Sequence, residues 1–266
     1  MNSAAQTRTS ALDKVADAAR PTRQLAQDLF EAVGLLDAQP SLRNALSDPT
    51  AEPEARAKLA NRLFADRLSA EATAVVVAAA QARWGSASEL VAGLDRQASR
   101  ALIGVAQGEG KLDQVEEELF LFERLVAGDQ ALREALDDRN APLAARQKVV
   151  AELLSGRADD VTVTLAQRAV AGRRRTFELT VDEQLQLAAQ ARQRAVARVK
   201  VARALDDAQA QRLRAALARQ VGRDVVLQVD VDPSVLGGAL VQVGDEIIDG
   251  TVSGRLAEAS KQLAAS

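Results

Sequence analysis

Apolar side chains recur at helical spacing along the chain up to about residue 200. Leu112, Val115, Leu119, Phe122 and Val126, for example, follow one another at intervals of three or four residues, as on one face of an amphipathic helix. Many of the proline and glycine residues fall between such stripes. The pattern predicts a series of helices of roughly 10 to 18 residues with short connections, as in a helical bundle.

This helical region repeats itself at an offset of about 90 residues. Two segments rich in Ala, Leu and Arg could also align through composition alone, but the register is constant through several helices and breaks. The constant register favours a duplicated helical unit, with a first copy at residues 1–94 and a second at 95–195. The matched positions include Leu29-Phe30 with Leu119-Phe120, Leu42-Arg43 with Leu132-Arg133, Asp48 with Asp138, and Arg56 with Arg146.

After about residue 196 the pattern changes to alternation with period two. Residues 196–202 and 225–231 alternate, and residues 206–221 between them have a helical stripe. Residues 239–243 and 246–248 flank a two-residue hairpin signal, and a last helix is predicted at 252–263. The expected fold is therefore mainly α: two successive helical bundle units, then a small α/β domain of order β-α-β-β-β-α at residues 196–266.

Composition removes most catalytic chemistry. The 266 residues contain no cysteine and no histidine, which excludes disulfides, thiolate and imidazole metal ligands, cysteine nucleophiles and histidine-dependent triads. Carboxylates could still act in pairs or hold Mg²⁺, but the sequence singles out no pair. We therefore predict no catalytic residue, no cofactor, no metal and no small-molecule substrate.

Charge and hydropathy narrow the location and the partners. A formal net charge of −3, spread along the chain, argues against a nucleic-acid binder. The first twenty residues carry charges every few positions and lack the apolar segment of a signal peptide, and no run of about 18 apolar residues appears. We expect a cytoplasmic protein without a membrane anchor of its own.

One glycine-rich segment, residues 108–111, invites comparison with a phosphate-binding loop. Val105 stands where that loop needs a glycine, and Leu112 stands where it needs a hydroxyl group. We interpret Gly108 and Gly110 as the end of one helix before the next begins.

The most specific motif spans residues 229–256. It combines Asp-Pro-Ser followed by two apolar residues and two glycines, a Gly-Asp hairpin, and the run Ile-Asp-Gly-Thr-Val-Ser-Gly-Arg-Leu. This motif resembles the C-terminal signature of the F-type ATP synthase delta subunit, the family of the mitochondrial oligomycin sensitivity-conferring protein. The signature residues are Asp232, Pro233, Gly237, Gly238, Gly244, Asp249, Gly250, Gly254 and Arg255.

Segments at residues 109–113 and 132–136 also resemble the helical domain of this family, so the resemblance covers roughly residues 95–266. The first ninety or so residues depart from the family pattern. They look like a duplicate of the helical domain without the strand domain.

The resemblance implies a non-catalytic connector in the stator of the ATP synthase. In this family the helical domain binds N-terminal helices of alpha subunits at the top of the catalytic head, and the C-terminal domain binds the b subunit of the peripheral stalk. The connection resists rotor torque during proton-driven ATP synthesis. Alpha and b are thus the expected partners, with beta as a further candidate, and the expected location is peripheral, on the cytoplasmic face of the bacterial plasma membrane.

The second helical copy has the family's usual position beside the α/β domain. We therefore expect its first and fifth helices, around residues 96–106 and 161–171, to hold an alpha-subunit helix, while the first copy braces the stalk or contacts another head subunit. Exposed apolar side chains for this groove would come from Leu102, Val105, Val161 and Leu165, although helical spacing alone would also place them in the core. A free-standing helical adaptor and a small carboxylate-dependent enzyme are the alternative interpretations.

Overall fold

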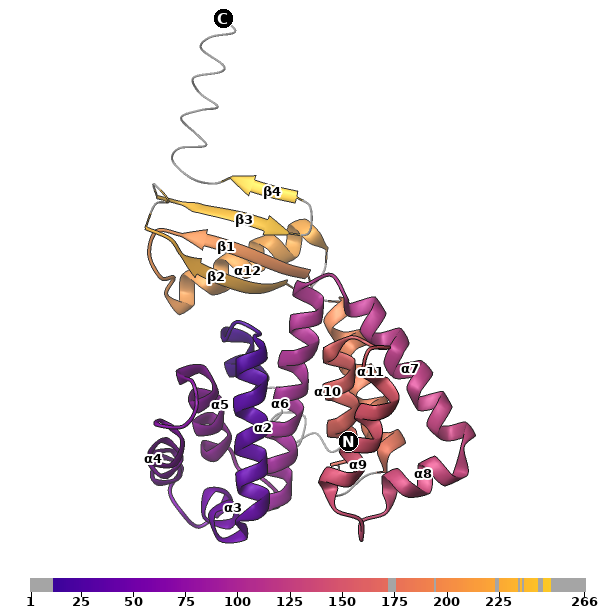
Figure 1. Ribbon diagram of the computed structural model, residues 1–266. Helices are drawn as coiled ribbons and strands as arrows, with labels where there is room; N and C mark the ends of the chain where they lie inside the picture. The colour runs from indigo at the N-terminus through magenta and orange to yellow at the C-terminus, as the bar shows by residue number, and fades with distance from the viewer. Residues whose placement is uncertain are drawn as a thin grey trace, which may run out of the picture. The chain divides into compact units, whose positions relative to one another are not determined.

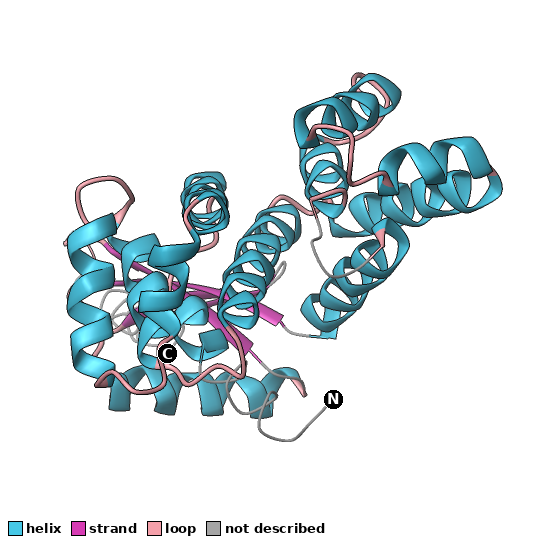
Figure 2. Cartoon of the chain, turned by 90° about the horizontal axis from the view of Figure 1, so that it is seen from below, coloured by secondary structure: helices cyan, strands magenta, loops and turns pink. Residues whose placement is uncertain are grey.

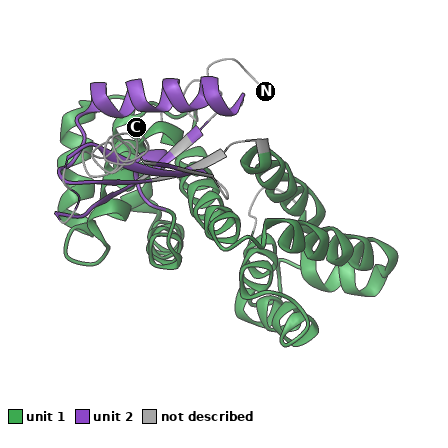
Figure 3. Ribbon diagram, turned by 90° about the horizontal axis from the view of Figure 1, so that it is seen from above, with its two compact units in different colours: residues 1–16, 21–192 green, residues 17–20, 193–266 purple. Residues whose placement is uncertain are grey.

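The computed structural model describes residues 12–171, 176–193, 195–222, 225–233, 235, 237–243 and 246–249. The chain divides into two compact units, one of residues 1–16 and 21–192 and one of residues 17–20 and 193–266 (Figure 3). All strands that the structure describes belong to the second unit (Figure 2). The predicted fold class, mainly α with a small C-terminal α/β domain, is confirmed.

The first unit consists of helices joined by short turns (Figure 1). Proline stands in the first turn of two of them, where its missing N–H costs no hydrogen bond. A helix at residues 12–18 is followed by α2 (Arg23–Ala38), α3 (Pro40–Ser47), α4 (Pro53–Phe64), α5 (Ala70–Gln81), α6 (Ala87–Gly108), α7 (Leu112–Gly128), α8 (Gln130–Asp137), α9 (Leu143–Leu154), α10 (Asp160–Ala169) and α11 (Phe177–Gln193).

Helix boundaries in this unit recur 90 residues later. Both ends of α3 and α4 reappear at that offset as the ends of α8 and α9, and α5 and α6 begin 90 residues before α10 and α11. Helix boundaries that recur at one constant offset are expected of a duplicated structural unit.

A polar contact repeats with the helices. Asp28 of α2 accepts a hydrogen bond of 2.8 Å from the N–H of Ser69, which is the N-cap of α5. At the same offset, Glu118 of α7 accepts one of 2.9 Å from Asp159, the N-cap of α10. Burial alone would raise the pKa of Asp28, but hydrogen bonds from Ser69 and Gln24 outweigh it and lower the pKa. Each copy thus ties its second helix to the start of its fifth.

An arginine in the fourth helix of each copy binds the other end of the fifth helix. Arg56, only 2% exposed, donates to the carbonyl oxygens of Ala82 and Gln81, both at 3.2 Å. Its equivalent Arg146 donates to the carbonyl oxygen of Val170 at 2.7 Å. Carbonyl groups at a helix C-terminus lack an intrahelical partner and carry partial negative charge, so a cation there is favourable.

The two copies share α6. This 22-residue helix contains the predicted boundary between residues 94 and 95. Its start corresponds to the start of α11, whereas residues 102–108 correspond to the helix at 12–18. No proline interrupts residues 87–108, so the last helix of the first copy continues as the first helix of the second. Both copies lie within the first compact unit.

The second unit is built on a four-stranded sheet of order β2-β1-β3-β4. Its elements are β1 (Ala195–Val201), α12 (Asp207–Val221), β2 (Val225–Val231), β3 (Ala239–Val243) and β4 (Glu246–Asp249). β1 pairs in parallel with β2 and antiparallel with β3, and β3 pairs antiparallel with β4. The order β-α-β-β-β agrees with the prediction, and the last predicted helix, at 252–263, lies outside the described residues.

Alternate residues of β1 form the centre of this unit's core. Ala197, Val199 and Val201 are buried and pack with Leu217 of α12. The helix is fixed at its start by a capping box between Asp206 and Gln209. A parallel pair needs such a crossover connection, and α12 supplies both the crossover and the apolar cover.

Val201→Asp should unfold the second unit, because a carboxylate at this 3%-exposed position has no partner. The expected loss is about 3–5 kcal/mol in the free energy of unfolding, measured by urea denaturation. Val231→Asp is the matched control, since Val231 is the partner of Val201 in the sheet register but is 47% exposed. Equal losses in both variants would contradict the assigned core face.

Arg56→Met should lower the free energy of unfolding of the first unit by roughly 2 to 3 kcal/mol, because the carbonyl groups at the end of α5 lose a charged donor. Lys58→Met on the exposed face of the same helix should change it by less than about 0.5 kcal/mol. Thermal and urea unfolding followed by circular dichroism measures both. An unchanged midpoint for Arg56→Met would show that the arginine does not stabilise the helix end.

Candidate partner-binding site

The structure places the four predicted groove residues in the core. Leu102 and Val105 of α6 are 4% and 9% exposed, and Val161 and Leu165 of α10 are 1% and 0% exposed. The expectation that they line an exposed groove is therefore corrected, because their helical stripes face inward in the bundle.

The reason lies in how the first copy covers α6. Asp13, in the helix at residues 12–18, accepts hydrogen bonds from Arg96, Gln97 and Arg100 of α6. Nearby, a Cβ added at Gly104 would lie 2.8 Å from the side chain of Pro21. Eight of the ten side-chain positions from residue 97 to 106 are buried. This half of α6 offers no free face to another protein.

A cation–π contact links the first copy to α10. The guanidinium carbon of Arg168 lies 4.4 Å from the centroid of the Phe30 ring on α2. Its Nη2 lies 2.8 Å from a carboxylate oxygen of Asp95 on α6. The Arg168 side chain thus connects α10 of the second copy with α2 of the first copy and with the shared helix α6.

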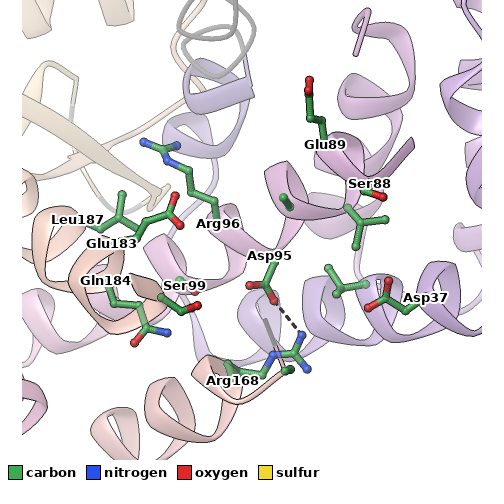
Figure 4. Close-up of a pocket in the computed structure, with 15 residues that line it drawn as sticks. Asp37, Ser88, Glu89, Asp95, Arg96, Ser99, Arg168, Glu183, Gln184 and Leu187 are labelled. Atoms are coloured by element: carbon green, nitrogen blue, oxygen red, sulfur yellow. Dashed lines mark hydrogen bonds and ion pairs between the residues drawn. The ribbon is translucent and has the colours of Figure 1, made fainter. Parts of the chain in front are cut away.

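A cavity of about 250 Å³ lies beside this contact, between α2, α6, α10 and α11 (Figure 4). Its charged lining consists of Asp37, Glu89, Asp95, Arg96, Arg168 and Glu183.

Gln184 also lines the cavity and is only 3% exposed. Its Nε2 donates a hydrogen bond to the carbonyl oxygen of Leu165, whereas its Oε1 has no hydrogen-bond partner. The corresponding residue of the first copy is the buried Leu94. The cavity is polar enough to hold ordered water, which needs such partners.

Three of the large exposed apolar side chains described in the first unit lie on α7, and the others are Leu143 of α9 and Leu179 of α11. Phe120, Leu121 and Leu125 are 48%, 56% and 53% exposed. Sequence analysis identified only the buried stripe of this helix. The sequence does contain a sign of the exposed face: these three residues are apolar although they lie outside the buried stripe.

Carboxylates accompany this apolar face. Burial raises the pKa of Glu123 on α7, and the negative charges of Asp182 and Glu178 on α11 raise it further. Arg192 of α11 pairs with Asp113 and Glu116 of α7, so charges of both signs are present where α7 meets α11. The single arginine of α7, Arg124, lies with its guanidinium carbon 6.0 Å from the centroid of the Phe120 ring.

The signature segment begins at the end of β2 and continues through the connection to β3. The N–H of Asp232 donates to the carbonyl oxygen of Val201 at 2.9 Å, so the end of β2 remains joined to β1. Gly237 and Gly238 have φ values of 67° and 79°, which side chains disfavour. This explains the glycine pair without a ligand. Pro233 lies in the same connection and Asp249 ends β4, whereas Gly244, Gly250, Gly254 and Arg255 lie outside the described residues.

The segment at residues 108–111 is a helix end, as predicted. Gly110 has φ of 73°, and the N–H of Lys111 donates to the carbonyl oxygen of Ala106 at 2.8 Å while that of Gly110 donates to Gln107. These two bonds form a Schellman motif. Lys111 then pairs with Asp159 at 2.8 Å, which raises the pKa of the lysine.

Within the described ranges, no three acidic side chains gather closely enough to hold a metal ion. None of the helices described there is both long enough and apolar enough to cross a membrane.

The sequence model of the ATP synthase delta (OSCP) subunit family matches residues 94–263. The chain belongs to this family. The ATP synthase subunit delta of Streptomyces avermitilis is 45% identical over 91% of this chain and 89% of its own length. Those of Kineococcus radiotolerans and Acidothermus cellulolyticus are 44% and 42% identical, over 90% and 92% of this chain and 87% and 90% of their own lengths.

Because these relatives align with about nine-tenths of the chain, they share most of the first helical copy, which the family model leaves out. A chain of the solved Toxoplasma gondii mitochondrial ATP synthase hexamer is 18% identical and covers 63% of this chain and 96% of its own, with a TM-score of 0.30, which is too low to carry a conclusion. As a delta (OSCP) family member, the chain is a subunit of the F-type ATP synthase and part of its peripheral stalk.

A double-mutant cycle tests the contact between the copies. We expect Phe30→Leu and Arg168→Met to show a coupling energy of about 1–2 kcal/mol, because the ring and the guanidinium are in close contact and partly desolvated. Phe120→Leu with Arg124→Met is the matched control at the equivalent, exposed phenylalanine, with an expected coupling below about 0.5 kcal/mol. Equal coupling energies from urea unfolding would show that Arg168 does not join the copies through Phe30.

Proposed function

We propose that the chain is the non-catalytic stator connector of a bacterial F-type ATP synthase. Its helical unit binds N-terminal helices of alpha subunits on the catalytic head, and its α/β unit binds the b subunit of the peripheral stalk. The observation that carries this proposal is the family match across residues 94–263, which spans the second helical copy and the α/β unit together. The protein acts at the cytoplasmic face of the membrane as a peripheral component of the complex.

A connector of this kind must transmit force without yielding. Rotation of the central shaft exerts torque on the head, and the head's catalytic sites change shape only if the head itself is held. Two features of the first unit support stiffness: the continuous α6 through both copies, and the buried or half-buried arginines that tie α4 to α5 and α9 to α10. Sharing a helix removes the flexible linker that separate domains would need.

Burial of Leu102, Val105, Val161 and Leu165 restricts where an alpha-subunit helix binds. It binds exposed surface of the helical unit and not a groove between α6 and α10, since α6 is covered by the chain itself. The first copy contributes by holding α6 in place. In this proposal the roles of the two copies are not separate, as their positions in the sequence suggest, because the first copy shapes the surface of the second.

The direct test is reconstitution with the full chain. Catalytic heads lacking this subunit should rebind to membranes that carry the b subunit only when the chain is added, and ATP-driven proton pumping should return. Val201→Asp should abolish binding to b while binding to the head persists, because only the α/β unit is unfolded. The purified chain should neither hydrolyse ATP nor give a binding signal in calorimetric titration with Mg-ATP.

Two results would overturn the proposal. Failure of the folded chain to bind either heads or b would leave a free-standing helical adaptor as the better interpretation. Saturable micromolar binding of Mg-ATP would contradict a purely mechanical role.

A further inference from the structure

The outer face of α7 lacks the counterpart of a contact that the second copy makes with the first. Phe30 of α2 is half-buried, because Arg168 from the second copy lies over its ring. Phe120 stands 90 residues later on α7, at the same position of the repeat, and is 48% exposed. In stacked repeats each unit covers the next, so the last unit presents an uncovered face. Phe120 lies on such a face, and α7 with α8 lies on the side of the helical unit away from α4 and α5 (Figure 1).

The face is larger than one ring. Leu121 and Leu125 are four residues apart, one helical turn, and are both more than half exposed. Leu121 replaces Glu31 of the first copy, so an apolar side chain stands where the equivalent position carries a charge. An isolated exposed leucine needs no explanation, whereas a phenylalanine and two leucines, all exposed within two turns of one helix, make α7 a candidate interaction surface.

The charge of α7 indicates the chemistry of what covers it. The helix carries five carboxylates, at residues 113, 116, 117, 118 and 123, and one arginine. Asp113 and Glu116 pair with Arg192, and Glu118 accepts a hydrogen bond from Thr162, so the charge available to a partner comes from the other two carboxylates. Glu117 is exposed and lies one turn before Phe120 and Leu121. Glu123 lies near Asp182 and Glu178 of α11, of which Glu178 also pairs with Arg133. The remaining like charges favour a cationic partner.

A second copy of the same chain, stacked on α7 as the second helical copy stacks on the first, would not place a cation over Phe120. The residue of the first copy that corresponds to Arg168 is Ala78, so head-to-tail stacking of two chains would place a methyl group over Phe120. The occupant is therefore a different protein.

We propose that Phe120, Leu121 and Leu125 form a docking surface for a basic amphipathic helix of another protein. The apolar stripe of that helix packs on the two leucines, in the manner of a helix laid along a hydrophobic face. A lysine or arginine of that helix stacks on the Phe120 ring and approaches Glu117, which reproduces the Arg168–Phe30 contact.

Two synthetic 18-residue helical peptides test the proposal with the full chain. Both carry the same leucine stripe, and their polar faces carry either arginine or glutamate. We expect the arginine peptide to bind with an affinity that falls as salt rises, and the glutamate peptide to bind at least tenfold more weakly, in fluorescence anisotropy.

Matched variants locate the binding site. Leu121→Gln with Leu125→Gln should weaken binding of the arginine peptide at least tenfold without adding charge, and Phe120→Ala alone should weaken it severalfold. Leu143→Gln on α9, 39% exposed in the same unit, should change it less than twofold. Glu117→Gln should reduce the salt dependence. Equal affinity for both peptides, or unchanged affinity in the double variant, would overturn the proposal.

The assembled ATP synthase gives an independent measurement. Benzoylphenylalanine in place of Leu121 should form a photo-crosslink to a helical segment that carries lysine or arginine, whereas the same group in place of Leu143 should not reach that segment. A crosslink to a second copy of this chain would show that the surface mediates self-association. Absence of any protein adduct would show that it stays uncovered, and either result contradicts the proposal.

Discussion

The arrangement of the helical unit depends on one constraint, that α6 serves two bundles at once. A helix that ends one unit and begins the next must be buried around most of its circumference in the shared half. Eight of residues 97–106 are buried, and all of these except Gln97 and Ser99 are apolar. Gly104 allows Pro21 to approach the helix closely, and Asp13 accepts a hydrogen bond from each of Arg96 and Arg100. The first copy is thus part of the fold of the second.

Sharing a helix changes what duplication means for function. Two bundles on a linker could each offer the same binding face to a partner. Here the first copy occupies the surface of α6 that the second copy would otherwise expose, and Arg168 fixes this arrangement through Phe30 and Asp95. Phe120 of the second copy corresponds to Phe30, but its ring remains 48% exposed. The duplication therefore moves the exposed apolar surface outward along the stack.

These features suit a connector. Torque transmission requires stiffness within a unit and strong attachment at separate surfaces, and neither requirement involves catalytic chemistry. The helical unit gains stiffness from a continuous central helix and from paired arginine contacts at helix ends. The α/β unit is a compact sheet whose core is formed by Ala197, Val199 and Val201 with Leu217.

The sequence by itself determined the local structure: the helical stripes, the 90-residue repeat, the strand order β-α-β-β-β and the family signature. These follow from periodicity and turn chemistry, which act between residues close in the chain. It did not determine that residues 94 and 95 lie within one helix, or that Leu102, Val105, Val161 and Leu165 are buried. Helical spacing identifies an apolar face but not what covers it, because that depends on contacts such as Asp13 with Arg100 between residues 87 positions apart. Only the tertiary structure decided that α6 is covered and α7 is open.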